Sequence, residues 1–236
     1  MKCSASVWLA ILSCRNQDRR ATLMNERHIK WWTPNLSREL EMLAFGNGGG
    51  LPLILFPTSF GRYHQNKDFG LVASVSGYVD AGKVTVYCPD AIDLESFYNK
   101  SIHPVDRMRT HNAYENVIVR DVFDLARREC NRHRVAVCGA SLGAYHAGNI
   151  AFRHPDLVSH FISLSGSFDI SSFFEGHQDD NIYFNSPYEY RPNVTDPLEI
   201  QSHGHHHWHR RMGQHPPRIV SALRNFELKR DQALAR

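Results

Sequence analysis

The chain has 236 residues, of which 42% are hydrophobic and 22% charged, and this size and balance predict one globular α/β domain with a sizeable core. Its formal charge of +3 is small and dispersed along the sequence, which argues against nucleic acid as a partner. No segment is long and apolar enough to span a bilayer, and so we expect no membrane partner.

The five cysteines are Cys3, Cys14, Cys88, Cys130 and Cys138. They show no paired metal-binding spacing, and two of them lie in apolar strand-like runs. We interpret them as core thiols of a protein from a reducing compartment, and their spacing predicts no metal site among them.

Residues 1–23 are interpreted as an extension or a misassigned start. The short apolar run 7–12 followed by Cys14 faintly resembles a lipoprotein signal, but the basic stretch after it does not fit one. Met24 opens a plausible start of its own. A cytoplasmic location is therefore expected.

Apolar runs and turns alternate from residue 29 onward. Strands are predicted at 29–33, 38–45, 51–56, 83–88, 134–138 and 158–164, helices at 69–79, 107–131 and 144–152, and a surface loop at 96–104. Runs that are apolar throughout, such as 51–56, indicate strands buried on both faces. The strand-helix-strand order predicts a doubly wound, mostly parallel sheet with right-handed crossovers, in a domain spanning residues 24–200.

The sequence Gly-Ala-Ser-Leu-Gly at 139–143 lies between a predicted strand and a predicted helix. In that context a G-x-S-x-G motif forms a sharp turn that exposes the serine hydroxyl, which makes Ser141 a candidate nucleophile. The amide of Leu142, first in the helix, would face a developing oxyanion.

Residues from about 31 to 197 resemble the esterase D-like esterases of the α/β-hydrolase superfamily. The matching stretches are 56–62, 138–146, 152–155, 157–158 and 179–185. The resemblance implies carboxylester hydrolysis of a small-molecule substrate through an acyl-enzyme on Ser141, without a cofactor. The implied oxyanion donors are the amides of Leu142 and of Ser59 or Phe60, and the implied pocket residues are Thr58, Tyr145 and His146.

A serine nucleophile also needs a histidine base and an orienting carboxylate, which follow the serine along the chain in this fold. The family's acid and histidine segments are not recognisable here. The candidates left are Asp169 or Asp196 as the acid and a histidine such as His209 as the base. The segment 166–197, rich in aromatic residues, is either a lid over the catalytic edge or an ordinary loop.

Residues 201–236 form an unusual tail, because six of the fifteen histidines fall between His203 and His215. Three interpretations stay open: a metal site, a source of the catalytic histidine, or a stretch translated out of frame from near Ser202. Shifting the frame by one nucleotide turns Trp208-His209 into glycine and Met212-Gly213 into tryptophan, which fits the family pattern. The sheet would then lack its last strands, leaving 158–164 as an exposed edge.

Two functions from different classes follow from these observations. The first is a serine carboxylesterase-like hydrolase. The alternative is a catalytically inactive binding protein with the α/β-hydrolase fold, or a truncated product, because the triad is incomplete in recognisable form.

Overall fold

The computed structural model of the chain describes residues 24–190. Its strands are β1 (Glu26–Thr33), β2 (Arg38–Phe45), β3 (Leu51–Phe56), β4 (Val84–Pro89), β5 (Val135–Ala140) and β6 (Val158–Leu164). Its helices are α2 (Gln65–Asp68), α3 (Leu71–Ser74), α4 (Ser76–Asp80), α5 (Pro104–Val117), the π-helical η2 (Ile118–Val122), α6 (Phe123–Cys130), α7 (Leu142–Arg153), the 3₁₀ turn η3 (Ser171–Phe173), α8 (Asp180–Phe184) and α9 (Pro187–Tyr190).

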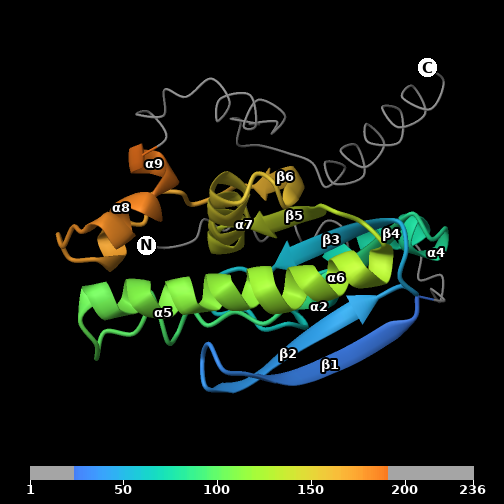
Figure 1. Cartoon of the computed structure of the whole chain (residues 1–236), viewed down its shortest axis with the longest axis horizontal. Helices are drawn as coiled ribbons and strands as arrows, with labels where there is room; N and C mark the ends of the chain where they lie inside the picture. Colours follow the sequence, from blue (N-terminus) through green and yellow to red (C-terminus); the bar gives the residue numbers. More distant parts are fainter. Residues whose placement is uncertain (1–23, 191–236) are drawn as a thin grey trace.

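The six strands form one sheet in the order β1-β2-β4-β3-β5-β6 (Figure 1). β1 and β2 form an antiparallel hairpin, and β2 pairs antiparallel with β4. The remaining pairs, β4 with β3, β3 with β5 and β5 with β6, are parallel. The predicted doubly wound, mostly parallel sheet is confirmed, and within residues 24–190 β6 is an edge strand.

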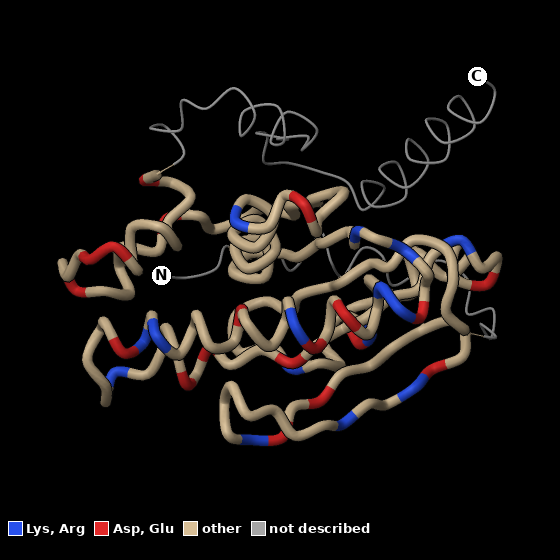
Figure 2. Tube along the Cα trace, in the orientation of Figure 1, with Lys and Arg blue, Asp and Glu red and all other residues tan. Residues whose placement is uncertain are grey.

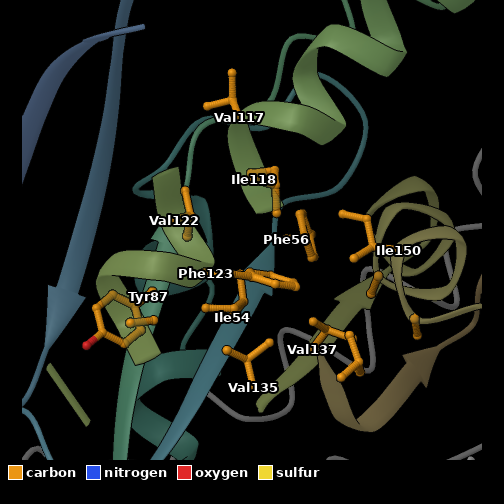
Figure 3. Close-up of a cluster of buried hydrophobic side chains, with 14 of the residues drawn as sticks. Ile54, Phe56, Tyr87, Val117, Ile118, Val122, Phe123, Val135, Val137 and Ile150 are labelled. Carbon is orange, nitrogen blue, oxygen red and sulfur yellow. The ribbon is translucent and has the colours of Figure 1, made fainter. Parts of the chain in front are cut away.

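Helices cover both faces of the sheet, which explains why the central strands are apolar throughout. On one face, α5, η2, α6 and α7 pack against alternate strand residues such as Ile54 and Phe56. On the other face, α3 and α4 pack against Leu53 and Leu55. Figure 3 shows the first of these cores, where Phe123 and Ile150 approach β3 from two different helices.

The predicted helix at 107–131 is present as one continuous helical run, α5–η2–α6, which begins at Pro104 and ends at Cys130. Its first turn is capped by the His103 ring, which accepts a hydrogen bond from the amide of Val105. Its last residue is followed by Asn131 in the left-handed conformation, with φ 48°. Acidic and basic residues are interspersed along the run (Figure 2), whereas its inner side belongs to the core.

Two predictions needed correction. The predicted helix at 69–79 consists of the short helices α3 and α4, with Gly70 at φ 78° marking the break from α2. The predicted surface loop at 96–104 is partly interior, since Ser96 and Phe97 are buried. Cys88, Cys130 and Cys138 are free and buried, as expected of core thiols.

None of the helices in residues 24–190 combines the length and the apolar character that a bilayer crossing requires. Residues 1–23 and the His-rich tail lie outside the described residues, so the predictions made for them stay predictions.

Candidate active site

Four loops meet at one edge of the sheet because β3, β4, β5 and β6 are parallel and their carboxyl ends lie together. We call residues 57–62 the β3 loop, residues 90–103 the β4 loop and residues 166–190 the cap. β3 and β5 are neighbours in the sheet. From β3 the chain continues to β4 on one side, whereas from β5 it continues to β6 on the other side, so the strand order reverses between β3 and β5. Such a switch point is where open α/β sheets bind ligands.

Ser141 lies at this switch point, between the end of β5 and the start of α7. Its backbone has φ 56° and ψ −122°, a conformation that a residue other than glycine adopts only under strain. Its amide donates to the carbonyl of Leu164 at 3.2 Å, and its carbonyl accepts from the amide of Ser167 at 3.2 Å. β6 and the start of the cap therefore brace the strained turn from one side.

Two glycines of the motif allow this turn because other backbone segments approach them closely. A Cβ on Gly139 would lie 2.2 Å from the carbonyl oxygen of Gly143. A Cβ on Gly143 would lie 2.3 Å from the carbonyl oxygen of Pro57. The start of α7 is thus pressed against β5 and against the β3 loop, which brings Ser141 and the β3 loop side by side.

The predicted oxyanion donors have free amides. Among the described residues, no acceptor is hydrogen-bonded to the backbone N–H of Leu142, Ser59 or Phe60. Leu142 begins a 12-residue helix, whose first amides carry the positive end of the helix dipole. Phe60 has φ 61°, so the β3 loop is strained as well. Free amides next to a strained serine could stabilise negative charge on an oxygen bound there.

The β3 loop is held by side chains on both sides. The Gln65 side-chain oxygen accepts hydrogen bonds from the amide of Thr58 at 2.7 Å and from its hydroxyl at 3.1 Å. At the other end, Asp90 at the start of the β4 loop accepts from the Arg62 guanidinium at 2.7 Å and from the amide of Tyr63 at 3.1 Å. Thr58, predicted to line the pocket, is half-buried in this loop.

Tyr145 and His146, also predicted to line the pocket, are instead buried beneath the turn at Ser141, at 0% and 1% exposure. The Tyr145 hydroxyl donates to the carbonyl of Asn185 at 2.8 Å, and His146 Nε2 lies 2.9 Å from Asp93 Oδ1. The inner face of α7 carries both side chains into the core. They attach α7 to the cap and to the β4 loop.

Further buried polar groups surround this pair. Burial and the neighbouring His146 lower the pKa of His111 to about 3, which keeps its ring neutral. Burial raises the pKa of Tyr145 well above its ordinary value. Burial alone would raise the pKa of Glu115, but the hydrogen bond from His154 and the charge of Arg153 outweigh it, and the pKa of Glu115 lies below its ordinary value.

The cap packs against the first turn of α7. Its residues Ile170, Phe174 and Ile182 form a cluster with Phe97 and Leu142. Arg107, 2% exposed, ties the cap to the β4 loop. Its guanidinium donates to the carbonyl of Asn99 and to that of Phe173, both at 2.7 Å, and to Glu175 at 3.0 Å. Sequence analysis missed Arg107, because a single arginine in a polar helix carries no signal of burial.

The acid and base candidates are only partly located. Asp169 is exposed, and its carboxylate accepts hydrogen bonds from the amide and hydroxyl of Ser171. Asp196 and His209 lie outside the described residues. Within residues 24–190, no histidine is hydrogen-bonded to the Ser141 hydroxyl, and no group of three or more His, Cys, Asp or Glu side chains could hold a metal.

Three solved structures with a similar fold are distant from the chain in sequence. A ferulic acid esterase superposes with a TM-score of 0.60 at 15% identity, over 78% of this chain and 76% of its own. The S-formylglutathione hydrolase FrmB of Staphylococcus aureus gives 0.55 at 13% identity, over 75% and 74%. An S-formylglutathione hydrolase of Agrobacterium tumefaciens gives 0.51 at 14% identity, over 68% and 65%. The fold is that of the α/β-hydrolase esterases.

No curated protein matches the chain. The family model named Esterase, with the description "Putative esterase", matches residues 84–224, a range that contains β4, the G-x-S-x-G motif and the cap. By this match over more than half of its length, the chain belongs to the Esterase family.

Proposed function

We propose that the chain is a serine carboxylesterase that hydrolyses a small-molecule ester through an acyl-enzyme on Ser141. The observation that carries the proposal is the strained turn at Ser141, which is followed directly by the amide of Leu142, an amide without a hydrogen-bond acceptor in residues 24–190. Family membership and the position at the switch point of the sheet support it further.

In the proposed reaction the Ser141 oxygen attacks the ester carbonyl carbon, and a base takes the hydroxyl proton. The carbonyl oxygen becomes an oxyanion between the amide of Leu142 and that of Ser59 or Phe60. Collapse of this intermediate expels the alcohol, which takes the proton from the base. A water molecule then repeats the sequence on the acyl-enzyme and releases the acid.

His209, oriented by Asp196, remains the proposed base, in the chain order that this fold uses. Asp169 is the weaker choice for the acid, because Ser171 already donates two hydrogen bonds to its carboxylate. These assignments predict that His209→Gln lowers kcat while leaving the turn at Ser141 folded.

Hydrolysis of p-nitrophenyl acetate by the full chain tests the proposal. We expect Ser141→Ala to lower kcat/KM by at least about 10³-fold. Ser76→Ala, at the start of α4 on the opposite face of the sheet, is the matched control and should retain the full rate. A rate that Ser141→Ala leaves unchanged would contradict the proposal.

A second candidate is an inactive binding protein with the same fold. It is favoured by one observation, the absence of a histidine bonded to the Ser141 hydroxyl within residues 24–190. No turnover by the wild-type chain, together with saturable binding of an ester that Ser141→Ala preserves, would support this candidate.

A further inference from the structure

The amides of Ser59 and Phe60 lie in the middle of a turn, which the Gly61 amide closes by donating to the carbonyl of Thr58 at 2.8 Å. Phe60 is in the left-handed region, with φ 61°, and its side chain is 55% exposed. A backbone conformation of this kind costs on the order of 1–3 kcal/mol and persists only when surrounding groups impose it. Gln65 holds Thr58 at the start of this turn, but its side chain makes no hydrogen bond to Ser59 or Phe60.

Tyr98, from the β4 loop, contacts both of these residues. Its hydroxyl donates to Ser59 Oγ at 3.1 Å. Its ring packs on the ring of Phe60, with centroids 4.2 Å apart and planes tilted by 41°. The Tyr98 ring also packs edge-to-face with the ring of Phe173 in the cap, with centroids 5.1 Å apart. Tyr98 therefore lies between the β3 loop and the cap.

Tyr98 is itself held firmly by buried neighbours. Its amide donates to the carbonyl of Asp93 at 2.9 Å, and the Asp93 side chain is paired with His146 of α7, both at 1% side-chain exposure. The next residue along the chain, Asn99, accepts from buried Arg107. The support for Tyr98 thus reaches back to the helix that begins after Ser141.

We propose that Tyr98 is a positioning residue that holds the amides of Ser59 and Phe60 in place for the oxyanion. The inference builds on the proposed function of Ser141 and adds a role that the motif does not specify. Tyr98 does not touch the reacting atoms. It acts through the Ser59 side chain and the Phe60 ring, and it links the β3 loop rigidly to α7.

The hydroxyl can be removed without removing the ring. Tyr98→Phe keeps the packing on Phe60 and Phe173 and deletes only the bond to Ser59 Oγ. We expect kcat for p-nitrophenyl acetate to fall about tenfold with KM changed less than about twofold, because a displaced donor weakens the transition state more than the bound ester. Tyr188→Phe, an equally conservative change on the exposed α9, is the control and should change neither constant.

A double-mutant cycle shows whether the hydroxyl acts through Ser59. Ser59→Ala removes the acceptor and keeps the backbone amide. If the bond is the means, Tyr98→Phe combined with Ser59→Ala should be no slower than either single variant. If each substitution lowers kcat independently, so that the two factors multiply in the double variant, the proposed route through Ser59 is wrong.

A second readout does not depend on turnover. Backbone ¹⁵N relaxation should show lower order parameters at Ser59 and Phe60 in Tyr98→Phe, toward the range below about 0.6 that marks flexible backbone. Val137 in β5 should remain near about 0.85. Unchanged order parameters and unchanged kcat would overturn the inference while Ser141→Ala still tests the proposed function separately. If Ser141→Ala retains the wild-type rate, the proposed function fails, and the catalytic role of Tyr98 fails with it.

Discussion

Gly143, in the first turn of α7, lies so close to Pro57 that a Cβ on the glycine would come within 2.3 Å of the Pro57 carbonyl oxygen. This contact joins α7 to the β3 loop. It also fixes the distance between the two backbone segments that supply the proposed oxyanion donors. The motif's second glycine is therefore required by this contact across the sheet edge.

Replacing Gly143 by alanine should separate these segments. We expect Gly143→Ala to lower the free energy of unfolding by about 1–3 kcal/mol, because backbone atoms must move to admit the methyl group. Ester hydrolysis should fall by about 10²-fold or more, because the donors move with the backbone. Urea unfolding and steady-state kinetics measure the two effects.

Gly77→Ala is the matched control for this substitution. Gly77 lies in α4, and a Cβ there would meet no atom within 4 Å. Alanine should stabilise this helical position slightly. Equal stability and activity of the two alanine variants would show that the contact with Pro57 does not matter.

His111 should make the fold sensitive to acid. Its pKa is about 3 in the folded chain and 6.5 in its ordinary state, so the unfolded chain binds the proton first as the pH falls. Protonation of His111 therefore leaves the free energy of unfolding unaffected above pH 6.5 and lowers it as the pH falls from 6.5 to about 3. From pH 7 to pH 5 the loss amounts to about 2 kcal/mol.

The neutral variant His111→Phe tests this origin, because it keeps the ring stacked on Phe97, whose centroid lies 4.8 Å away. Urea unfolding at pH 7, 6 and 5 should give a shallower pH dependence for the variant. Glu115 contributes stability that is lost only as the pH falls below about 4.5, so it does not interfere in this range. If the free energy of unfolding depends on pH equally in wild type and in His111→Phe, His111 is not the source of the acid sensitivity.

Arg107 should be a major contributor to the attachment of the cap. Arg107→Met keeps the apolar stem and leaves the carbonyls of Asn99 and Phe173 without their charged donor. We expect the free energy of unfolding to fall by about 2–4 kcal/mol. Limited proteolysis should cut the cap faster than in wild type.

The ion pair between Arg107 and Glu175 should matter much less. The Glu175 side chain is half exposed, and exposed ion pairs contribute at most about 1 kcal/mol. Glu175→Gln should therefore lower the free energy of unfolding by at most about 1 kcal/mol. A loss as large as that of Arg107→Met would mean that the ion pair, and not the two carbonyl contacts, holds the cap.

The sequence predicted the parts of the fold whose cause is local. β2, β3 and β6 have the predicted bounds because apolar runs end at glycine, proline or polar residues, and the turn at Ser141 follows from a motif of five residues. Tyr98 and the pair formed by Asp93 and His146 were not predicted as site supports. Their roles depend on contacts between residues 39 and 53 positions apart, and a polar and aromatic stretch such as 93–98 is equally typical of a surface loop.

Reaction of the full chain with a fluorophosphonate, followed by peptide mass spectrometry, tests the central claim most directly. The account predicts one covalent adduct on Ser141, formed in wild type and absent in Ser141→Ala. An adduct on another serine, or an unmodified Ser141 in a folded protein, would contradict it.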